Sequence, residues 1–358
     1  MTANDRKKKI KPPMFFPDAT RGFLKTLSAG DIKAAGIKGL VVNTYHLFLS
    51  PGVEIIRKAG GIHKFMGWDG PVMSDSGGYQ VYSLIHKGGA KMGKITDRGA
   101  VFKSPIDGRT EELTPEKSIQ IQFDLGTDIM VSLDDCPPND YDRGAIAAAV
   151  DRTVAWAKRC RLEFDRQIKR RKIDKKNRPL LFAVIQGGAY KDLRKSCAGK
   201  LAAIGFDGYG FGARHIGQNG KFMAEILKTT AAAVPAGAFK FALGIGTPAD
   251  IVRAHRLGWQ MFDCVIPTRE GRHGRLFYEK SGTAAGKLKP DFYKTINITN
   301  SKFKKDFSPI NANSKLPELK SNTKAYLYYL LKNNEALGQR LASLHNLEFY
   351  AKLISRLK

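Results

Sequence analysis

Short apolar runs of strand length recur along the chain, and helix-like segments separate many of them. Several runs are rich in β-branched or aromatic residues, which favours strands. They occupy residues 40–45, 71–76, 128–135, 180–188, 208–213, 241–246 and 261–267. Strands that alternate with helices predict parallel β/α units, and a (β/α)8 TIM barrel is the economical architecture for a chain of 358 residues. A doubly wound open sheet is the alternative.

Two intervening segments carry explicit helix-start signals. Thr114 precedes Pro115, and Thr247 precedes Pro248, so each pair supplies an N-cap and a proline at the first helical position. Gly258 marks the end of the second helix. Apolar residues also recur at helical spacing near the C-terminus, beyond an irregular stretch at 302–324. We therefore expect a barrel core over residues 1–280 and a helical subdomain over 281–358.

The composition favours a soluble, basic protein. No run of 18 apolar residues could span a membrane, and the basic N-terminus lacks the apolar segment of a secretory signal, so a cytoplasmic location is expected. The four cysteines lie far apart with no C-x-x-C pair, which argues against a disulfide framework. A formal charge of +27 suggests a polyanionic partner such as nucleic acid.

Polar residues occur at the ends of five of the apolar runs. They are Asn43, Asp75, Asp134, Gln186 and Asp263. In a barrel such strand ends converge on one face, where active sites lie. Two convergent carboxylates suit nucleophilic substitution at an acetal-like carbon, because one can attack while the other moves protons. The sequence therefore predicts a glycosyl-transfer site.

The stretch "MFDCVIPTREGRHGRLF" places an acid inside an apolar run that breaks at Pro267 into a basic loop. The acid is Asp263, and the loop carries Arg269, Arg272 and His273. With the net charge of +27, an Arg-rich loop beside the acid fits an RNA substrate better than a neutral sugar, which needs no basic cleft.

Several stretches together resemble the tRNA-guanine transglycosylase family. They include "NTYHLFLSPG", "GPVMSDSGGYQVYSL", "LTPEKSIQIQFDLGTDIMVSLDDC", "VIQGG", "GIGTPADIV" and "MFDCVIPTREGRHGRLF", in the family's order and spacing from about residue 10 to the C-terminus. The resemblance implies a (β/α)8 barrel that exchanges the wobble guanine of tRNAs with G-U-N anticodons for a 7-deazaguanine, on the queuosine route. It implies a homodimer and no ATP or redox cofactor.

The resemblance also implies roles for individual residues. Asp263 resembles the nucleophile that attacks C1′ of the ribose, and Asp75 the general acid/base, with Asn43 supporting Asp75. The residues that would bind the base are Asp134, Gln186, Gly212 and Ala213 at its polar edge, with Tyr79 and Leu243 at its faces. The residues that would bind tRNA are Arg269, Arg272 and His273.

The chain departs from the family at the usual zinc site. Ser314, Leu316 and Leu319 stand where cysteine ligands are expected, and only His345 remains. One histidine cannot hold tetrahedral zinc, so we predict that this subdomain binds no metal and is stabilised by burial of its leucines.

A second departure lies in the segment 212–218, which normally reads the 7-substituent of the base. Ala213 replaces a glycine, Arg214 and His215 replace small or apolar residues, Ile216 is bulky, and Gln218 replaces a glutamate. Loss of that carboxylate removes a counter-charge for an ammonium group. The incoming base therefore stays open among the aminomethyl, cyano and queuine forms.

Three other functions compete with this interpretation. A relative that modifies DNA would keep the fold, but the 267–277 motif favours tRNA. A non-catalytic partner subunit would be expected to lose the acids, yet Asp75, Asp134 and Asp263 are present. A glycoside hydrolase would need the two carboxylates but no basic cleft.

Overall fold

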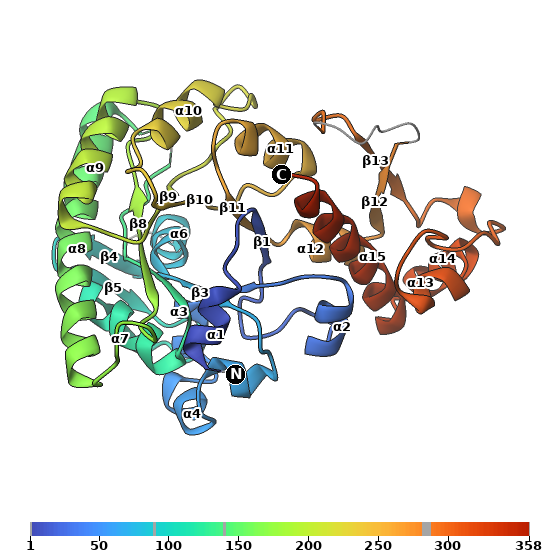
Figure 1. Ribbon diagram of the computed structural model, residues 1–358, viewed down its shortest axis with the longest axis horizontal. Helices are drawn as coiled ribbons and strands as arrows, with labels where there is room; N and C mark the ends of the chain where they lie inside the picture. The colour runs from blue at the N-terminus through green and yellow to red at the C-terminus, as the bar shows by residue number, and fades with distance from the viewer. Residues whose placement is uncertain (1, 89–90, 139–140, 281–287, 358) are drawn as a thin grey trace.

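Eight parallel strands form the centre of the molecule, in a computed structural model that describes residues 2–88, 91–138, 141–280 and 288–357 (Figure 1). The strands are β1 (Met14–Pro17), β2 (Leu40–Asn43), β3 (Val72–Asp75), β7 (Ile129–Val131), β8 (Leu180–Ile185), β9 (Gly208–Phe211), β10 (Phe239–Ala242) and β11 (Met261–Cys264). Their order is β1-β11-β10-β9-β8-β7-β3-β2. A parallel bridge between Asp18 and Val41 joins β1 to β2, and the Ala19 N–H donates to the Val41 carbonyl at 2.7 Å. The sheet therefore closes into the predicted barrel.

Helices cover the outside of the barrel, and an antiparallel sheet is inserted after β3. The helices are α1 (Ala3–Lys8), α2 (Ala29–Ala34), α3 (Thr44–Leu49), α4 (Val53–Lys58), α5 (Ile62–Met66), α6 (Gly78–Gly88), α7 (Pro115–Leu125), α8 (Arg143–Arg170), α9 (Lys191–Ile204), α10 (Ala224–Ala232), α11 (Pro248–Arg256) and α12 (Ile266–Arg272). The inserted sheet comprises β4 (Gly93–Thr96), β5 (Gly99–Lys103) and β6 (Thr110–Leu113).

The two predicted helix starts are confirmed. The Thr114 hydroxyl accepts the Lys117 N–H at 3.1 Å, and the Thr247 hydroxyl accepts the Asp250 N–H at 3.1 Å. Each threonine thus satisfies one of the free N–H groups of a first helical turn, and the following proline has no N–H to satisfy.

Side chains that alternate along the strands divide the core into an inner and an outer part. The inner cluster fills the barrel with Met14 and Phe16 of β1, Val41 of β2, Met73 of β3 and their counterparts on the other strands. The residues between them, such as Phe15, Val42 and Val72, pack outward in a separate cluster with the surrounding helices. This alternation is the two-residue period of a strand, and it fixes which strand-end residues face the barrel mouth.

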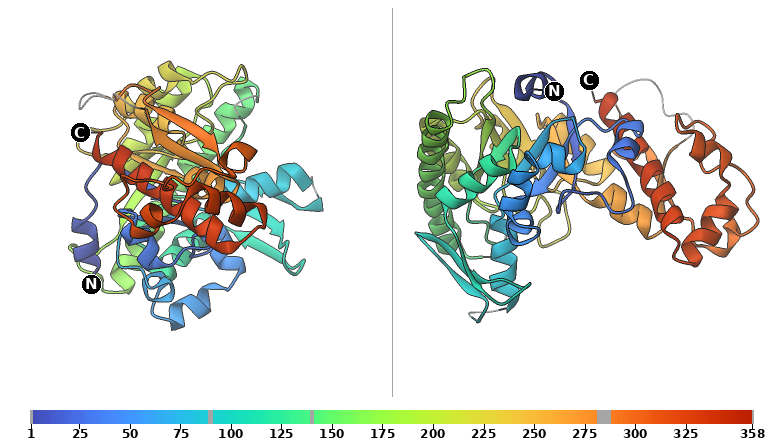
Figure 2. Two further views of the ribbon diagram at one scale, coloured as in Figure 1. Left: turned by 90° about the vertical axis from the view of Figure 1, so that its right-hand side faces the viewer. Right: turned by 90° about the horizontal axis from the view of Figure 1, so that it is seen from below.

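A C-terminal lobe, residues 275–280 and 288–357, projects from one side of the barrel (Figure 2). It contains β12 (Arg275–Glu279), β13 (Tyr293–Asn297), the short helix η2 (Ser301–Phe303), α13 (Pro317–Ser321), α14 (Lys324–Lys332) and α15 (Ala336–Ser355). Strand β12 pairs antiparallel with β13 across the expected domain boundary at 280/281. Residues 281–287 lie outside the described residues, so the boundary stays a prediction.

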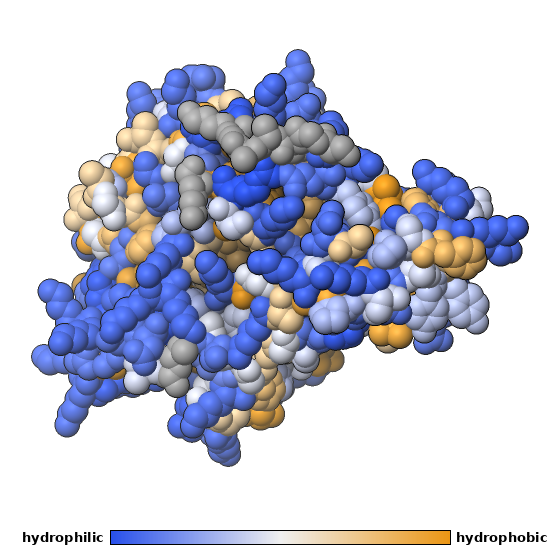
Figure 3. All heavy atoms as spheres, turned by 45° about the vertical axis from the view of Figure 1, so that its right-hand side comes forward, coloured by the Kyte–Doolittle hydropathy of each residue, from blue (hydrophilic) through white to orange (hydrophobic). Residues whose placement is uncertain are grey.

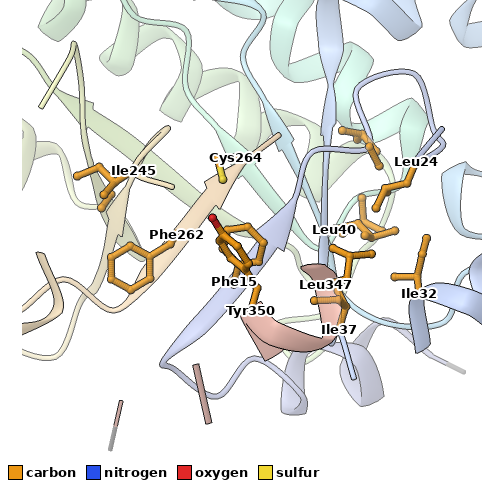
Figure 4. Packing of buried hydrophobic residues seen from close by; sticks show 14 of the residues in the cluster. Phe15, Leu24, Ile32, Ile37, Leu40, Ile245, Phe262, Cys264, Leu347 and Tyr350 are labelled. Carbon is orange, nitrogen blue, oxygen red and sulfur yellow. The ribbon is translucent and has the colours of Figure 1, made fainter. Parts of the chain in front are cut away.

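Helix α15 anchors this lobe on the outer face of the barrel. The Tyr350 ring lies against that of Phe15, with ring centroids 4.9 Å apart, and its hydroxyl donates to the Gly246 carbonyl at 2.7 Å. Figure 4 shows both rings beside Phe262 and Cys264 of β11. The lobe is therefore attached to β1 and to the loop after β10, beside the strand that carries Asp263.

Three local expectations are corrected. Strand β1 was not among the predicted runs. The segment after Pro267 is helix α12 rather than a loop, because a proline is compatible with the first turn of a helix. The 302–324 stretch contains η2 and α13, so it is partly helical. Within the described parts of the chain, no helix is both long and apolar enough to cross a membrane.

Candidate active site

The strand-end residues form one layer at the mouth of the barrel. Each lies two residues after an inward-facing position of its strand, so each faces the same way as the interior. This layer consists of Asp18, Asn43, Asp75, Gln186, Gly212, Leu243 and Asp263. Asp134, in the loop that follows β7, joins the layer through a hydrogen bond to Gln186. The barrel therefore assembles all five polar residues that the sequence placed at strand ends.

Asp75 is held by three donors. The Asn43 amide donates to Oδ2 at 2.5 Å, while the Thr44 and Gly77 N–H groups donate to Oδ1 at 3.2 and 3.1 Å. Burial raises the pKa of Asp75 to about 8, and the negative charge of Asp18 adds to the effect against the opposing backbone hydrogen bonds. A carboxyl with this pKa keeps its proton at neutral pH.

Asp263 at the end of β11 has fewer partners. Its Oδ1 accepts the Gly244 N–H at 2.8 Å. Burial raises its pKa to about 7, although the Gly244 hydrogen bond opposes the rise. Of the two acids Asp75 has the higher pKa, so a single proton held by the pair lies on Asp75 and the charge lies on Asp263. Such a split allows one carboxyl to act as an acid while the other acts as a nucleophile.

A polar pair lies beside these acids. The Gln186 amide donates to Asp134 Oδ2 at 2.7 Å, and the Ser76 hydroxyl approaches Oδ1 at 3.4 Å. Both Asp134 and Gln186 are buried, and burial raises the pKa of Asp134 to about 6. A Cβ at Gly212 would lie 2.4 Å from the Gln186 amide nitrogen, so this position requires glycine. The pair presents acceptors and donors of the kind that read a base edge.

The two predicted ring-contacting residues lie on different elements. Tyr79 is in the first turn of α6, and its side chain is 59% exposed. Leu243 follows β10 and lies over Gly210, where a Cβ would approach its Cδ1 to 2.4 Å. An exposed aromatic ring in this position is free to stack on a ligand.

The altered segment 212–218 splits into two parts. Ala213 has a φ of +70°, a left-handed conformation that costs a residue with a Cβ about 1 kcal/mol. His215 turns toward α11, where its Nε2 lies 3.4 Å from Asp250 Oδ2. Arg214 and Gln218 are exposed. Arg214 and His215 are the two residues that replace small or apolar ones in this segment. Of these two, His215 packs against the neighbouring helix α11.

Arg194 of α9 supports the pocket and was missed in the sequence. Its guanidinium is fully buried and donates to the carbonyls of Ile185 at 2.7 Å, Gly212 at 2.9 Å and Gly188 at 3.0 Å. It also lies 4.1 Å from the centroid of the Phe211 ring. These bonds tie the loop after β8 to the loop after β9. An arginine in an amphipathic helix gives no sequence signal for this role.

Asp18 was also missed, although a signal was present. The run "MFFP" is followed directly by an acid, Asp18, just as the run "PVMS" is followed by Asp75, and β1 has the same inward and outward alternation as the other strands. The seven apolar runs named from the sequence do not include β1, so the residue at the end of this eighth strand was given no role.

The predicted tRNA-binding residues follow directly from the Asp263 strand. Arg269 is half exposed and lies 3.4 Å from Glu270, and His273 is exposed just after α12. Arg272 makes no ion pair with any described residue, and burial together with the charge of Arg269 lowers its pKa. A half-buried cation without a carboxylate partner is suited to an anionic ligand.

The residues at the usual zinc positions do not fit the metal. The Ser314 hydroxyl donates to Glu348 Oε2 at 2.6 Å, and the Lys315 N–H donates to Glu348 Oε1 at 2.6 Å. Leu316 and Leu319 are buried. The His345 Nε2–H donates to the Phe277 carbonyl at 2.8 Å, and burial lowers its pKa to about 4. Among the described residues, no three His, Cys, Asp or Glu side chains are grouped as metal ligands.

The family model and the individual relatives that match this chain carry the same name. Residues 2–358 match the protein family described as queuine tRNA-ribosyltransferase. A protein of that name from Blochmanniella pennsylvanica is 40% identical over 351 residues, which are 98% of this chain and 88% of the relative. Its namesakes from Nitrosospira multiformis and Natranaerobius thermophilus are 39% and 40% identical, over 98% of this chain and 88% and 87% of their own lengths.

The hydrogen bonds of Glu348 predict how the C-terminal lobe is stabilised. Glu348→Ala removes the acceptor of both the Ser314 hydroxyl and the Lys315 N–H, so it should cost about 1–3 kcal/mol. We expect a lower melting temperature and faster proteolysis of the lobe. Glu335→Ala is the matched control, because Glu335 makes no side-chain cap bond at the start of α15.

A chelator should not change the melting temperature of the unaltered protein. One zinc per chain in elemental analysis would contradict the prediction that the lobe binds no metal.

Proposed function

The chain belongs to the queuine tRNA-ribosyltransferase family, whose members are tRNA-modifying glycosyltransferases, and on this premise we propose a specific reaction. The protein exchanges the wobble guanine of tRNAs with G-U-N anticodons for a 7-deazaguanine, through a covalent Asp263–ribose intermediate. The observation that carries this proposal is the pair of carboxyls at one barrel mouth, with the higher pKa on Asp75 and the lower on Asp263.

The first displacement uses the two acids in different protonation states. A carboxylate oxygen of Asp263 forms a bond to C1′ while the C1′–N9 bond breaks, and the electron pair of that bond leaves with the purine. Asp75 gives its proton to the departing purine, so guanine leaves neutral and Asp75 becomes a carboxylate. The three donors to Asp75 then stabilise the charge that it acquires.

The second displacement reverses the roles. The Asp75 carboxylate takes a proton from the incoming 7-deazaguanine, whose nitrogen attacks C1′ and releases the Asp263 carboxylate. Two inversions at C1′ restore the original configuration, as in other double displacements through a carboxylate ester. No added cofactor is needed for these steps.

Base recognition falls to the polar pair and the adjacent backbone. Asp134 and Gln186 face the base edge together with the peptide of Ala213, since the N–H of Gly212 is bonded to Ile185 and its carbonyl to Arg194. Tyr79 and Leu243 contact the two ring faces. The exposed amide of Gln218 supplies no counter-charge for an aminomethyl group, so the aminomethyl, cyano and queuine bases all stay candidates.

The polymer is tRNA rather than DNA in this proposal. The net charge of +27 supports a nucleic acid as the substrate. The half-buried Arg272 is the last residue of α12, the short helix that follows the Asp263 strand. Figure 3 shows a face covered largely by hydrophilic side chains.

The reaction in this proposal takes place in the cytoplasm. A non-catalytic partner subunit would not need the split protonation of Asp75 and Asp263.

The active form in this proposal is a homodimer that uses the C-terminal lobe. Tyr326 and Tyr329 lie on one face of α14 and are 42% and 61% exposed, while Leu327 and Leu330 are buried on the other. Phe307, in the same lobe, is 74% exposed. Exposed aromatic side chains of this kind are typical of protein interfaces.

The exchange itself is tested with labelled guanine. The protein should incorporate guanine into unmodified tRNA with a G-U-N anticodon, but not into duplex DNA. Asp263→Asn should reduce incorporation about 10³-fold or more and abolish the covalent protein–RNA band on a denaturing gel. Asp69→Asn, which removes an exposed acid before β3, is the control. A normal adduct in Asp263→Asn would exclude the assigned nucleophile.

Arg272 should contribute one phosphate contact. Arg272→Ala should weaken tRNA binding and reduce the slope of log affinity against log salt concentration by about one. Filter binding across a salt series measures both quantities. Lys58→Ala is the control, because Lys58 is an exposed cation on α4. An unchanged slope would remove Arg272 from the RNA contact surface.

The dimer is tested by light scattering at micromolar concentration. The unaltered protein should have the mass of two chains, and Tyr329→Lys should shift it toward the mass of one because it buries an unpaired charge in an apolar interface. Leu162→Lys is the matched control, since Leu162 is 63% exposed on α8 outside the lobe. A monomeric unaltered protein would contradict the dimer proposal.

A further inference from the structure

A third carboxyl, that of Asp18, lies between the two acids in the order of strands around the barrel. Asp263 lies near the end of β11, Asp18 follows β1, Asn43 ends β2 and Asp75 ends β3, and these strands are consecutive neighbours once the barrel is closed. Asp18 comes two residues after Phe16, which is paired in register with Asp263 and faces the barrel interior. The side chain of Asp18 therefore belongs to the same layer as the two acids.

Local bonds hold Asp18 in this place. The Thr20 N–H donates to Asp18 Oδ1 at 2.8 Å and the Thr20 hydroxyl donates to the same oxygen at 2.5 Å. The Asp18 N–H donates to the Cys264 carbonyl at 3.3 Å, next to Asp263. No Lys, Arg or His of the described residues forms an ion pair with Asp18. The carboxylate is thus fixed in position, and its charge has no direct counter-ion there.

The charges around Asp18 come from several elements. Asp75 of β3 and Asp263 of β11 both experience its negative charge, which raises their pKa values after the effect of burial. His46 of α3 is also affected, but burial and Arg21 lower its pKa, so it is neutral near pH 7. Cys264 is buried, and burial keeps its pKa well above the usual thiol value. Of these neighbouring groups, the two acids are therefore the ones whose proton can be transferred near neutral pH.

We propose that Asp18 is a positioning residue of the reaction, whose negative charge retains the transferable proton on Asp75 until the purine departs. This inference rests on the proposed exchange reaction. Asp18 makes no bond to the reacting atoms in this mechanism. Its charge favours the form in which one proton is shared by the acids, because full ionisation would place three like charges in one layer. The proton then passes to the purine when the C1′–N9 electron pair leaves.

The test replaces the charge and preserves the shape. In Asp18→Asn both limbs of the bell-shaped pH profile of kcat/KM for guanine exchange should move to lower pH, by about one unit. The sign follows because removal of a negative neighbour lowers the pKa of each remaining acid. Above the alkaline limb the rate should fall about tenfold relative to the unaltered protein. Asp18→Glu, which keeps the charge, should restore the profile.

A direct titration separates this inference from the exchange reaction. Infrared spectra of protein labelled with ¹³C-aspartate show the protonated carboxyl, and Asp75→Asn identifies the band of Asp75. In Asp18→Asn this band should disappear at a pH about one unit lower than in the unaltered fold. Asp69→Asn, which removes an exposed acid that pairs with Lys33, should leave it unchanged.

The outcomes are distinguishable. An unaltered protein without exchange activity would overturn the proposed function, while the infrared titration would still decide the effect of Asp18. A band midpoint that does not move in Asp18→Asn, in a variant with normal melting, would overturn the inference. A uniform loss of rate at every pH with an unmoved profile would also overturn it, because that pattern belongs to a residue that contacts the substrate.

Discussion

The closure of the barrel between β1 and β2 is the constraint on which the rest of the site depends. The two strands on each side of this seam carry Asp263, Asp18, Asn43 and Asp75. The Asp18–Val41 bridge fixes the register of β1 against β2, and regular pairing fixes β11 against β1 and β3 against β2. A shift of one residue in any strand would turn its terminal side chain from the mouth to the helical layer. The buried inner cluster opposes such a shift, because the shift would move apolar side chains such as Phe16 and Met73 out of the barrel interior. Packing in the interior thus determines where the acids lie.

Burial at the mouth then determines what the acids can do. Carboxyls in this position lose their contacts with water, and hydrogen-bond donors of the protein replace these contacts to different extents. Asp75 accepts hydrogen bonds from three donors, and Asp263 accepts one. Donors alone would give Asp75 the lower pKa, yet its pKa is the higher of the two. Burial and the neighbouring charge of Asp18 therefore outweigh the hydrogen bonds. The donors matter most after the proton has gone, when they hold the resulting carboxylate.

Much of the fold could be predicted from the sequence, because apolar periodicity and helix caps are local signals. Seven strand regions and the caps at Thr114 and Thr247 lie where the pattern placed them. Strand β1 (Met14–Pro17) was missed although other strands are equally short, because prolines at positions 12, 13 and 17 surround its apolar residues and proline argues against a strand. The role of Arg194 could not be predicted, since its three carbonyl partners lie on loops that only the fold brings together, whereas the strand end at Asp18 did leave a signal in the sequence. Proline at 267 was read as a break, although its effect depends on whether a helix begins there.

The C-terminal lobe has a direct bearing on the active site because α15 fixes the position of α12. The buried Asn346 side chain donates to the carbonyls of Pro267 and Arg275 at 2.9 Å and accepts the Phe277 N–H at 3.1 Å. Gly271 brings α12 so close to α15 that a Cβ there would lie 2.9 Å from the backbone of Ala342. Helix α12 carries Arg269 and Arg272 and starts two residues after β11. The bonds from Ser314 and Lys315 to Glu348, two residues from Asn346 on the same helix, therefore help to keep the basic helix beside Asp263. A lobe that loosened would move the cations away from the carboxylate, and the acid would lose the electrostatic surroundings that suit it to an RNA backbone.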